Sequence, residues 1–161
     1  MGFSIRPATP ADSHALARLR YAFRSSCGEP CERADEFIKR CASWMAARLD
    51  GKGLWRCWVV EDEAQIVGQV WLQLIEKIPN PSAEPERHAY LTNLYVNETA
   101  RGRGLGARLL STALDFCAAQ EVHAVILWPT EKSRLLYQRY GFSRPAELFE
   151  LRVAAAPGSC F

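Results

Sequence analysis

The stretch that most constrains the fold of this chain runs from Asn97 to Leu110 and reads NETARGRGLGARLL. Residues 101–108 hold three glycines and three arginines, and small and apolar residues follow directly. Glycine takes the backbone conformations of tight turns more readily than any other residue. The pattern therefore predicts a glycine-rich turn between a strand over 88–96 and a helix over 102–120.

Such a turn is suited to binding an anion. The first turn of a helix exposes backbone N–H groups that have no partner within the helix, and the helix dipole adds partial positive charge. Arg101, Arg103 and Arg108 add full charges. These features indicate a phosphate or pyrophosphate ligand. The turn lacks the Gly-Lys-Ser/Thr end of a nucleotide-binding P-loop, and its glycine spacing does not fit the G-x-G-x-x-G dinucleotide pattern.

The rest of the chain alternates strand-like and helix-like segments. Hydrophobic periodicity, β-branched runs and turn residues predict six strands and four helices in the order β-α-α-β-β-β-α-β-α-β. The fold class is therefore α/β (α+β), with a mixed sheet of about six to seven strands flanked by about four helices. The predicted strands cover 3–8, 54–61, 64–76, 88–96, 122–128 and 146–153, and the predicted helices cover 9–23, 34–50, 102–120 and 130–142. Strand 122–128 is apolar enough to be buried on both faces.

Composition narrows the class of protein. The 161 residues suit a single domain over 1–161, with 154–161 expected to form a loose tail. A net charge of +2 disfavours a nucleic-acid binder. No apolar run approaches a membrane span, and no signal-peptide pattern opens the chain, so we expect a cytoplasmic protein without membrane contact. The six cysteines and three histidines show no zinc-site spacing, so no metal is expected.

Two motifs in this order resemble the GNAT superfamily of acetyl-CoA-dependent N-acetyltransferases. The first is Arg101-x-x-Gly104-x-Gly106, placed between a strand and a helix. The second is LLYQRYGF over 135–142, a helix with a tyrosine four residues before Gly-Phe. The resemblance implies a GNAT-like fold, acetyl-CoA as co-substrate and direct acetyl transfer to a primary amine in a ternary complex.

The resemblance also implies which residues hold the co-substrate. The backbone of Leu94, Tyr95 and Val96 corresponds to the part of the family's strand that hydrogen-bonds the pantetheine arm. The backbone amides that would hold the pyrophosphate belong to Arg101, Gly102, Arg103, Gly104, Leu105, Gly106 and Ala107. Thr130 stands where the family often has an asparagine that contacts the cofactor, and Ser133 stands where a small alanine is usual.

Tyr137 matches the family's tyrosine near the thioester sulfur, and its implied role is the general acid that protonates the departing CoA thiolate. The general base remains open. Many family members use a glutamate on the strand that ends here at Val96, but HAYLTN, residues 88–93, contains no carboxylate. His88, Tyr90, Glu76 or a water molecule are the alternatives. Cys117 is predicted to be a core residue.

The resemblance leaves the acceptor open. In this fold the loops over 25–36 and 77–87 form its site, and their acidic residues suit a cationic amine or simply face solvent. Trp55, Trp58 and Trp71 are predicted to be core. The acceptor class stays open between a small amine and a peptide amine, as do the acyl-chain preference and the oligomeric state, with a homodimer as one option. The alternative function is a non-catalytic acyl-CoA-binding or sensing module on the same fold.

Overall fold

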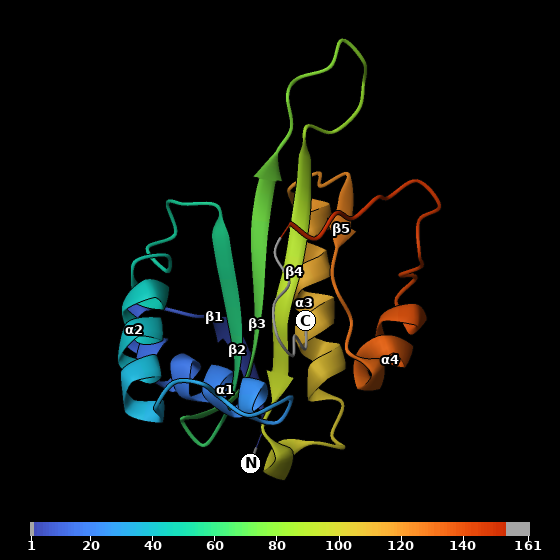
Figure 1. The fold of residues 1–161 in the computed structure, drawn as a ribbon. Coiled ribbons are helices and arrows are strands. Elements are labelled where there is room, and N and C mark those ends of the chain that lie inside the picture. The colour runs from blue at the N-terminus through green and yellow to red at the C-terminus, as the bar shows by residue number, and fades with distance from the viewer. Residues whose placement is uncertain (1, 154–161) are drawn as a thin grey trace. The chain divides into compact units, whose positions relative to one another are not determined.

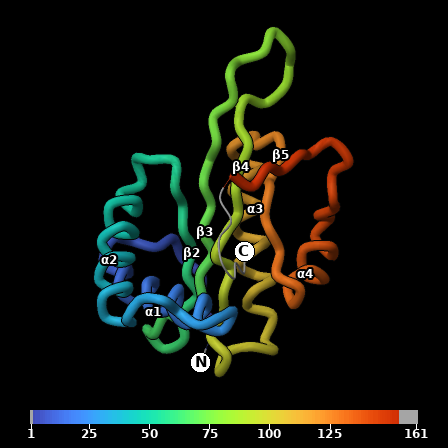
Figure 2. Tube along the Cα trace, in the orientation of Figure 1, coloured from blue at the N-terminus to red at the C-terminus, as the bar shows by residue number. Residues whose placement is uncertain are grey.

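A computed structural model describes residues 2–153 of the chain (Figures 1 and 2). The chain divides into two compact units, Met1–Leu127 and Trp128–Phe161, which are described separately. The proposed extent of one domain over 1–161 stays a prediction. The tail predicted over 154–161 lies outside the described residues.

The first unit is built on one five-stranded sheet (Figure 1). Its strands lie in the order β1 Ser4–Pro7, β2 Trp55–Asp62, β3 Gln65–Glu76, β4 Arg87–Val96 and β5 Ala124–Ile126. The first three pairs are antiparallel and β4 pairs with β5 in parallel, so the predicted mixed sheet is confirmed. The strand count is lower than the six to seven expected. As a short edge strand, β5 is only partly buried, so the prediction of burial on both faces was wrong.

Helices cover both faces of this sheet. Helices α1 (Ser13–Ser25) and α2 (Ala34–Ala46) pack on one face, where Leu16 and Met45 share a core cluster with Trp71 of β3. Helix α3 (Leu105–Ala119) packs on the opposite face, where the ring of Phe116 lies 5.2 Å from that of Trp58. Trp58 is opposite Val70 in the β2–β3 ladder, and Val70 precedes Trp71, so side-chain alternation places the two indoles on opposite faces.

A short 3-10 helix, η1 (Pro10–Asp12), joins β1 to α1 and is held by an ionic cluster. The Asp12 carboxylate accepts hydrogen bonds from the Thr9 backbone N–H at 2.7 Å and from Nη1 of Arg6 at 2.8 Å. Arg6 also donates to Glu61 of β2. This guanidinium holds the pKa of Asp12 at about 2, below its ordinary value of 3.8, with the Thr9 bonds adding to the effect. The cluster fixes the start of α1 against the sheet edge.

The second unit contains a 3-10 helix, η3 (Glu131–Ser133), and the six-residue α4 (Arg134–Arg139). The predicted stop at Gly141 is confirmed, because Gly141 has φ +88°. Its N–H donates to Gln138 O at 3.0 Å, and Phe142 N–H donates to Tyr137 O at 3.1 Å. These two bonds form a Schellman cap, which needs a left-handed residue after the helix.

The last predicted strand was wrong. Residues 146–153 form no strand ladder in the described part of the chain. Their apolar side chains are largely exposed, with Phe149 at 93% and Leu151 at 85%. The alternation of AELFELRV is a strand pattern in the sequence, but a strand also requires a partner with free hydrogen-bonding groups.

Candidate functional site

The glycine–arginine turn forms as predicted. Gly102 and Gly104 have φ values of +78° and +71°, and a Cβ at either position would meet no atom within 4 Å. Gly104 is the N-cap of α3, and no side chain caps the helix there. Hydrogen bonding within the helix begins with the Arg108 N–H, which donates to Gly104 O at 3.1 Å. The turn therefore leads into the N-terminus of α3, and a ligand can approach the backbone of the turn closely.

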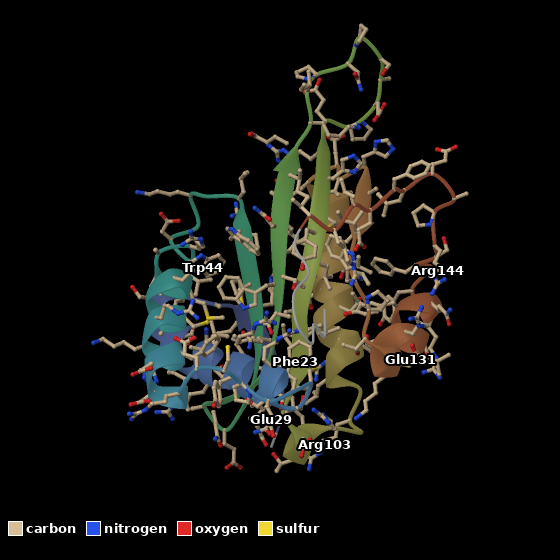
Figure 3. All side chains as sticks on the ribbon, viewed as in Figure 1. Phe23, Glu29, Trp44, Arg103, Glu131 and Arg144 are labelled. Atoms are coloured by element: carbon tan, nitrogen blue, oxygen red, sulfur yellow. The ribbon has the colours of Figure 1, made fainter. Side chains whose placement is uncertain are left out.

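The three arginines of the turn contact the protein itself. Arg101 Nε donates to the Val96 carbonyl at 3.0 Å, and its guanidinium lies 5.5 Å from the centre of the Tyr95 ring. Arg108 donates to Phe3 O at 3.2 Å, and the Arg103 guanidinium lies 5.2 Å from the Phe3 ring centre. Figure 3 labels Arg103 on the segment before α3. All three side chains are exposed, so the backbone is the stronger feature of this turn.

The edge of β4 that leads to this turn lacks a neighbouring strand. Within residues 2–153, the ladder with β5 covers only His88, Ala89 and Tyr90 of β4. The backbone of Leu94, Tyr95 and Val96 therefore lies beyond the end of β5, on the open edge. Polar backbone groups on an open strand edge can pair with an added extended chain, as a pantetheine arm would require.

A bulge reshapes β4 just before these residues. Gln69 faces Tyr95 and Trp71 faces Thr92, so Asn93 and Leu94 together oppose the single residue Val70. Asn93 has φ +54°, a left-handed conformation that asparagine tolerates better than most residues, and its side chain is buried. Bulges of this kind bend a strand and redirect its side chains.

Gly68 on β3 allows close approach next to the bulge. A Cβ built on Gly68 would lie 2.8 Å from Val60 Cγ1 and 3.0 Å from the Tyr95 carbonyl oxygen. Any other residue at this position would therefore push against the strand that carries Leu94 to Val96. The tight packing of Gly68 holds that part of β4 in place.

Three predicted site residues lie in the second unit: Thr130, Ser133 and Tyr137. The Tyr137 side chain is buried, its ring centre lies 5.5 Å from that of Phe142, and its carbonyl takes part in the Schellman cap. Thr130 Oγ1 donates to Ser133 Oγ at 2.9 Å, and Ser133 Oγ donates to Thr130 O at 3.0 Å. The two hydroxyls therefore support each other at the start of η3. The roles given to all three residues stay predictions.

The alternatives for the general base lie on the first half of β4 or beside it. Glu76 is exposed and faces Arg87, at the end of β4 that is far from Val96. The His88 ring stacks on that of His123 with centres 5.4 Å apart, and its buried Nδ1 has no hydrogen-bond partner within residues 2–153. Tyr90 faces Gln73 and is half-buried. The geometry singles out none of the three.

Three of the six acidic residues in the two predicted acceptor loops have basic partners. Glu32 pairs with Arg40 at 2.7 Å, Asp35 pairs with Arg33 at 2.9 Å, and Glu84 contacts both Lys77 and His123. The pairing favours the solvated-surface alternative over an acidic wall for a cationic amine. Trp58 and Trp71 are buried as predicted, and Trp55 is half-buried. The burial of Cys117 also confirms its place in the core and raises its pKa to about 11.

One residue near this edge was missed by the sequence analysis. Arg20 of α1 is half-buried, and its Nη1 lies 3.4 Å from Oδ1 of Asn93 on the β4 bulge. The signal was present, because Leu16, Leu19, Arg20 and Phe23 follow the i, i+3, i+4, i+7 spacing of a buried helix face. An arginine at such a position is directed toward the sheet rather than toward water.

No helix within residues 2–153 is long and apolar enough to span a membrane. In the same part of the chain, no three His, Cys, Asp or Glu side chains gather as metal ligands. The absence of a metal stays a prediction.

Comparisons with known proteins agree on one family. The model of the acetyltransferase (GNAT) family matches residues 16–142. A GCN5-related N-acetyltransferase from Ralstonia eutropha is 27% identical, with a TM-score of 0.78 over 95% of this chain and 100% of its own. A predicted acetyltransferase from Clostridium acetobutylicum, solved with acetyl-CoA, is 23% identical, with a TM-score of 0.78 over 94% and 97%. An aminoglycoside acetyltransferase from a soil metagenome is 16% identical, with a TM-score of 0.70 over 96% and 100%, which shows likeness of fold. None of the curated proteins searched matches the chain.

Proposed function

The chain belongs to the acetyltransferase (GNAT) family, and we propose that it transfers an acetyl group from acetyl-CoA to a primary amine. The observation that carries this proposal combines two features: an α3 N-terminus whose N-cap, Gly104, makes no side-chain cap, and an adjoining edge of β4 that pairs with no other strand beyond Tyr90 within residues 2–153. The turn suits a pyrophosphate, and the edge of β4 suits an amide-containing arm that continues from it.

The proposal gives roles to particular groups of the chain, which follow from its resemblance to the family. The backbone amides of residues 101–107 would hold the pyrophosphate, and the backbone of Leu94 to Val96 would hydrogen-bond the pantetheine. Thr130 and Ser133 would contact the co-substrate through their hydroxyls. When bound, acetyl-CoA supplies an acetyl thioester, whose acetyl group passes to the amine nitrogen as the carbon–sulfur bond breaks.

Proton transfers complete the reaction. The ammonium form of the acceptor loses one proton before the nitrogen attacks, and the base that takes this proton is open between His88, Tyr90, Glu76 and water. Tyr137 donates its hydroxyl proton to the departing thiolate and is reprotonated as the nitrogen releases its second proton. The role of Tyr137 rests on the match of residues 135–142 to the second family motif. A cytoplasmic location and a homodimer remain predictions.

The test is release of free CoA thiol from acetyl-CoA in the presence of a panel of amines, amino acids and peptides. The wild type should release thiol only when an acceptor is present. Tyr137→Phe should lower kcat by about 100-fold or more, the usual range for loss of a general acid. Tyr140→Phe, on the same helix end, is the matched control and should keep its activity.

Calorimetry of acetyl-CoA binding separates the remaining outcomes. Binding with normal affinity to Tyr137→Phe is expected, because the hydroxyl acts on the leaving group. Binding without turnover of any panel member would favour the alternative, a non-catalytic acyl-CoA sensor. Absence of acetyl-CoA binding would overturn the proposal.

A further inference from the structure

Arg20 lies next to the bulge of β4 and has no acidic partner in the part of the chain that the structure describes. Within residues 2–153, the one hydrogen bond of its side chain is the long contact of 3.4 Å from Nη1 to the neutral side chain of Asn93, and its guanidinium lies 5.8 Å from the centre of the Phe23 ring. No Asp or Glu within residues 2–153 forms an ion pair with it. A guanidinium carries five N–H donors in a planar fork, so most of its capacity remains unused.

The surroundings of Arg20 disfavour its charge. The charged neighbour that acts on it is Arg24, one helical turn further along α1, and the other neighbours are Cys41, Tyr90 and Cys27. Burial, with a smaller contribution from Arg24, lowers the pKa of the Arg20 guanidinium below its ordinary value. Charges that are taken out of water in proteins are normally paired with an opposite charge. The missing anion is a feature that the fold alone does not explain.

The position of Arg20 connects it to the transfer site. Asn93 belongs to the bulge of β4 and directly precedes Leu94, where the proposed pantetheine-binding backbone begins. Phe23, one turn after Arg20 and labelled on α1 in Figure 3, stacks on Tyr95 with ring centres 5.3 Å apart. Helix α1 therefore faces the part of β4 that would adjoin the acyl group. An acceptor that approaches from this face of the sheet meets Arg20.

We infer that Arg20 binds an anionic group of the acceptor, and that the acceptor is an amine bearing a carboxylate, of the amino-acid type. The inference rests on the proposed acetyltransferase function and specifies its substrate class. A carboxylate would accept two parallel N–H bonds from the guanidinium, which is the geometry that distinguishes arginine from lysine at such sites. It would also supply the negative charge that the surrounding residues lack.

The test compares matched acceptors that differ only in charge. Each L-amino acid, together with β-alanine, is assayed beside its carboxamide, and kcat/KM is determined from thiol release. The wild type should favour the acids, and Arg20→Met should reduce the ratio of acid to amide by at least tenfold, mainly through KM of the acids. Arg20→Lys should retain part of the preference, because it keeps the charge and loses the fork.

Controls separate recognition from a structural role. Arg18→Met removes an exposed arginine of the same helix and should leave the ratio unchanged. If Arg20 merely supports Asn93, Arg20→Met will lower turnover of acids and amides equally, and the inference is overturned. Preference for cationic amines, or no turnover of any carboxylate-bearing amine, overturns it as well.

Calorimetry with acetyl-CoA distinguishes the other source of an anion. If the partner of Arg20 were a phosphate of CoA, Arg20→Met would weaken acetyl-CoA binding, which would contradict the inference. We expect unchanged affinity. Failure of the wild type to bind acetyl-CoA would instead count against the proposed function, so the two failures are told apart.

Discussion

Arg6 and Arg20 are two partly buried arginines of the same unit that differ in their partners. Arg6 of β1 donates to the carboxylates of Asp12 and Glu61, which tie together three elements of the fold. Arg20 of α1 has one long contact to a neutral amide and a second arginine as its charged neighbour. We interpret the paired charge of Arg6 as serving the fold, and the charge of Arg20, which has no acidic partner within residues 2–153, as pointing to a partner from outside the chain.

The largest expected difference between the two arginines lies in how much each contributes to the free energy of unfolding. Arg6→Met leaves the Asp12 and Glu61 carboxylates without their cation and should lower the free energy of unfolding by about 2 kcal/mol, less than the 3–5 of a fully buried pair because Arg6 is partly exposed. Arg20→Met should change it by less than about 1 kcal/mol, since an unpaired cation gives way to an apolar side chain. Urea denaturation measures both. Equal losses would remove the distinction between the two sites.

Acid should weaken the Arg6 cluster in a defined range of pH. The pKa of Asp12 is about 2 in the folded protein, compared with an ordinary value of 3.8 for an aspartate. Folding therefore favours the ionised form of this carboxyl group. The stability that the ionised Asp12 carboxylate contributes to the fold is fully present above pH 3.8 and is lost as the pH falls through 3.8 toward 2. It amounts to about 1–2 kcal/mol after allowance for solvent screening.

Asp12→Asn isolates this contribution. The variant should be less stable than the wild type near neutral pH, and the difference should shrink as the pH falls toward 2. Denaturation curves at several pH values give the comparison, because the other carboxylates titrate in both proteins. A constant difference across the range would show that Asp12 does not act through its charge.

The glycine–arginine turn is a third place in the same unit where positive charge gathers. Here the backbone is proposed to bind the ligand, so Gly104→Val should weaken acetyl-CoA binding by about tenfold, since a left-handed residue with a side chain costs about 1–2 kcal/mol. Gly53→Val is the control, because Gly53 has open space and lacks a positive φ. Calorimetry measures both. Undiminished affinity in Gly104→Val would place the ligand elsewhere.

The smallest effect is expected for the charges of the turn. Arg103 is exposed and contacts the Phe3 ring, so its charge is well solvated. Arg103→Gln should weaken acetyl-CoA binding by less than about threefold, and the loss should fade as salt is added. A loss of affinity larger than that of Gly104→Val would show that the Arg103 side chain contributes more to acetyl-CoA binding than the backbone of the turn.

Features that are set by residues close together in the sequence could be predicted, whereas features that depend on residues far apart in the sequence could not. The turn at Gly102 and Gly104 and the cap at Gly141 were predictable because a positive φ is set by neighbouring residues. Strand 146–153 was not, because its alternation is local but a ladder needs a partner. The lack of an acidic partner for Arg20 within residues 2–153 depends on the β4 bulge and on the packing of α1, which are tertiary features. Its place on the apolar face of α1 was nevertheless visible in the sequence.

A competition experiment decides whether Arg20 selects acceptors that carry a carboxylate. Wild type and Arg20→Met are each given acetyl-CoA with an equimolar mixture of the best amino-acid acceptor and its carboxamide, and the two acetylated products are quantified by mass spectrometry. We expect a large excess of the acetylated acid with the wild type and a ratio of acid to amide product at least tenfold lower with Arg20→Met. Equal product ratios in the two proteins would contradict it.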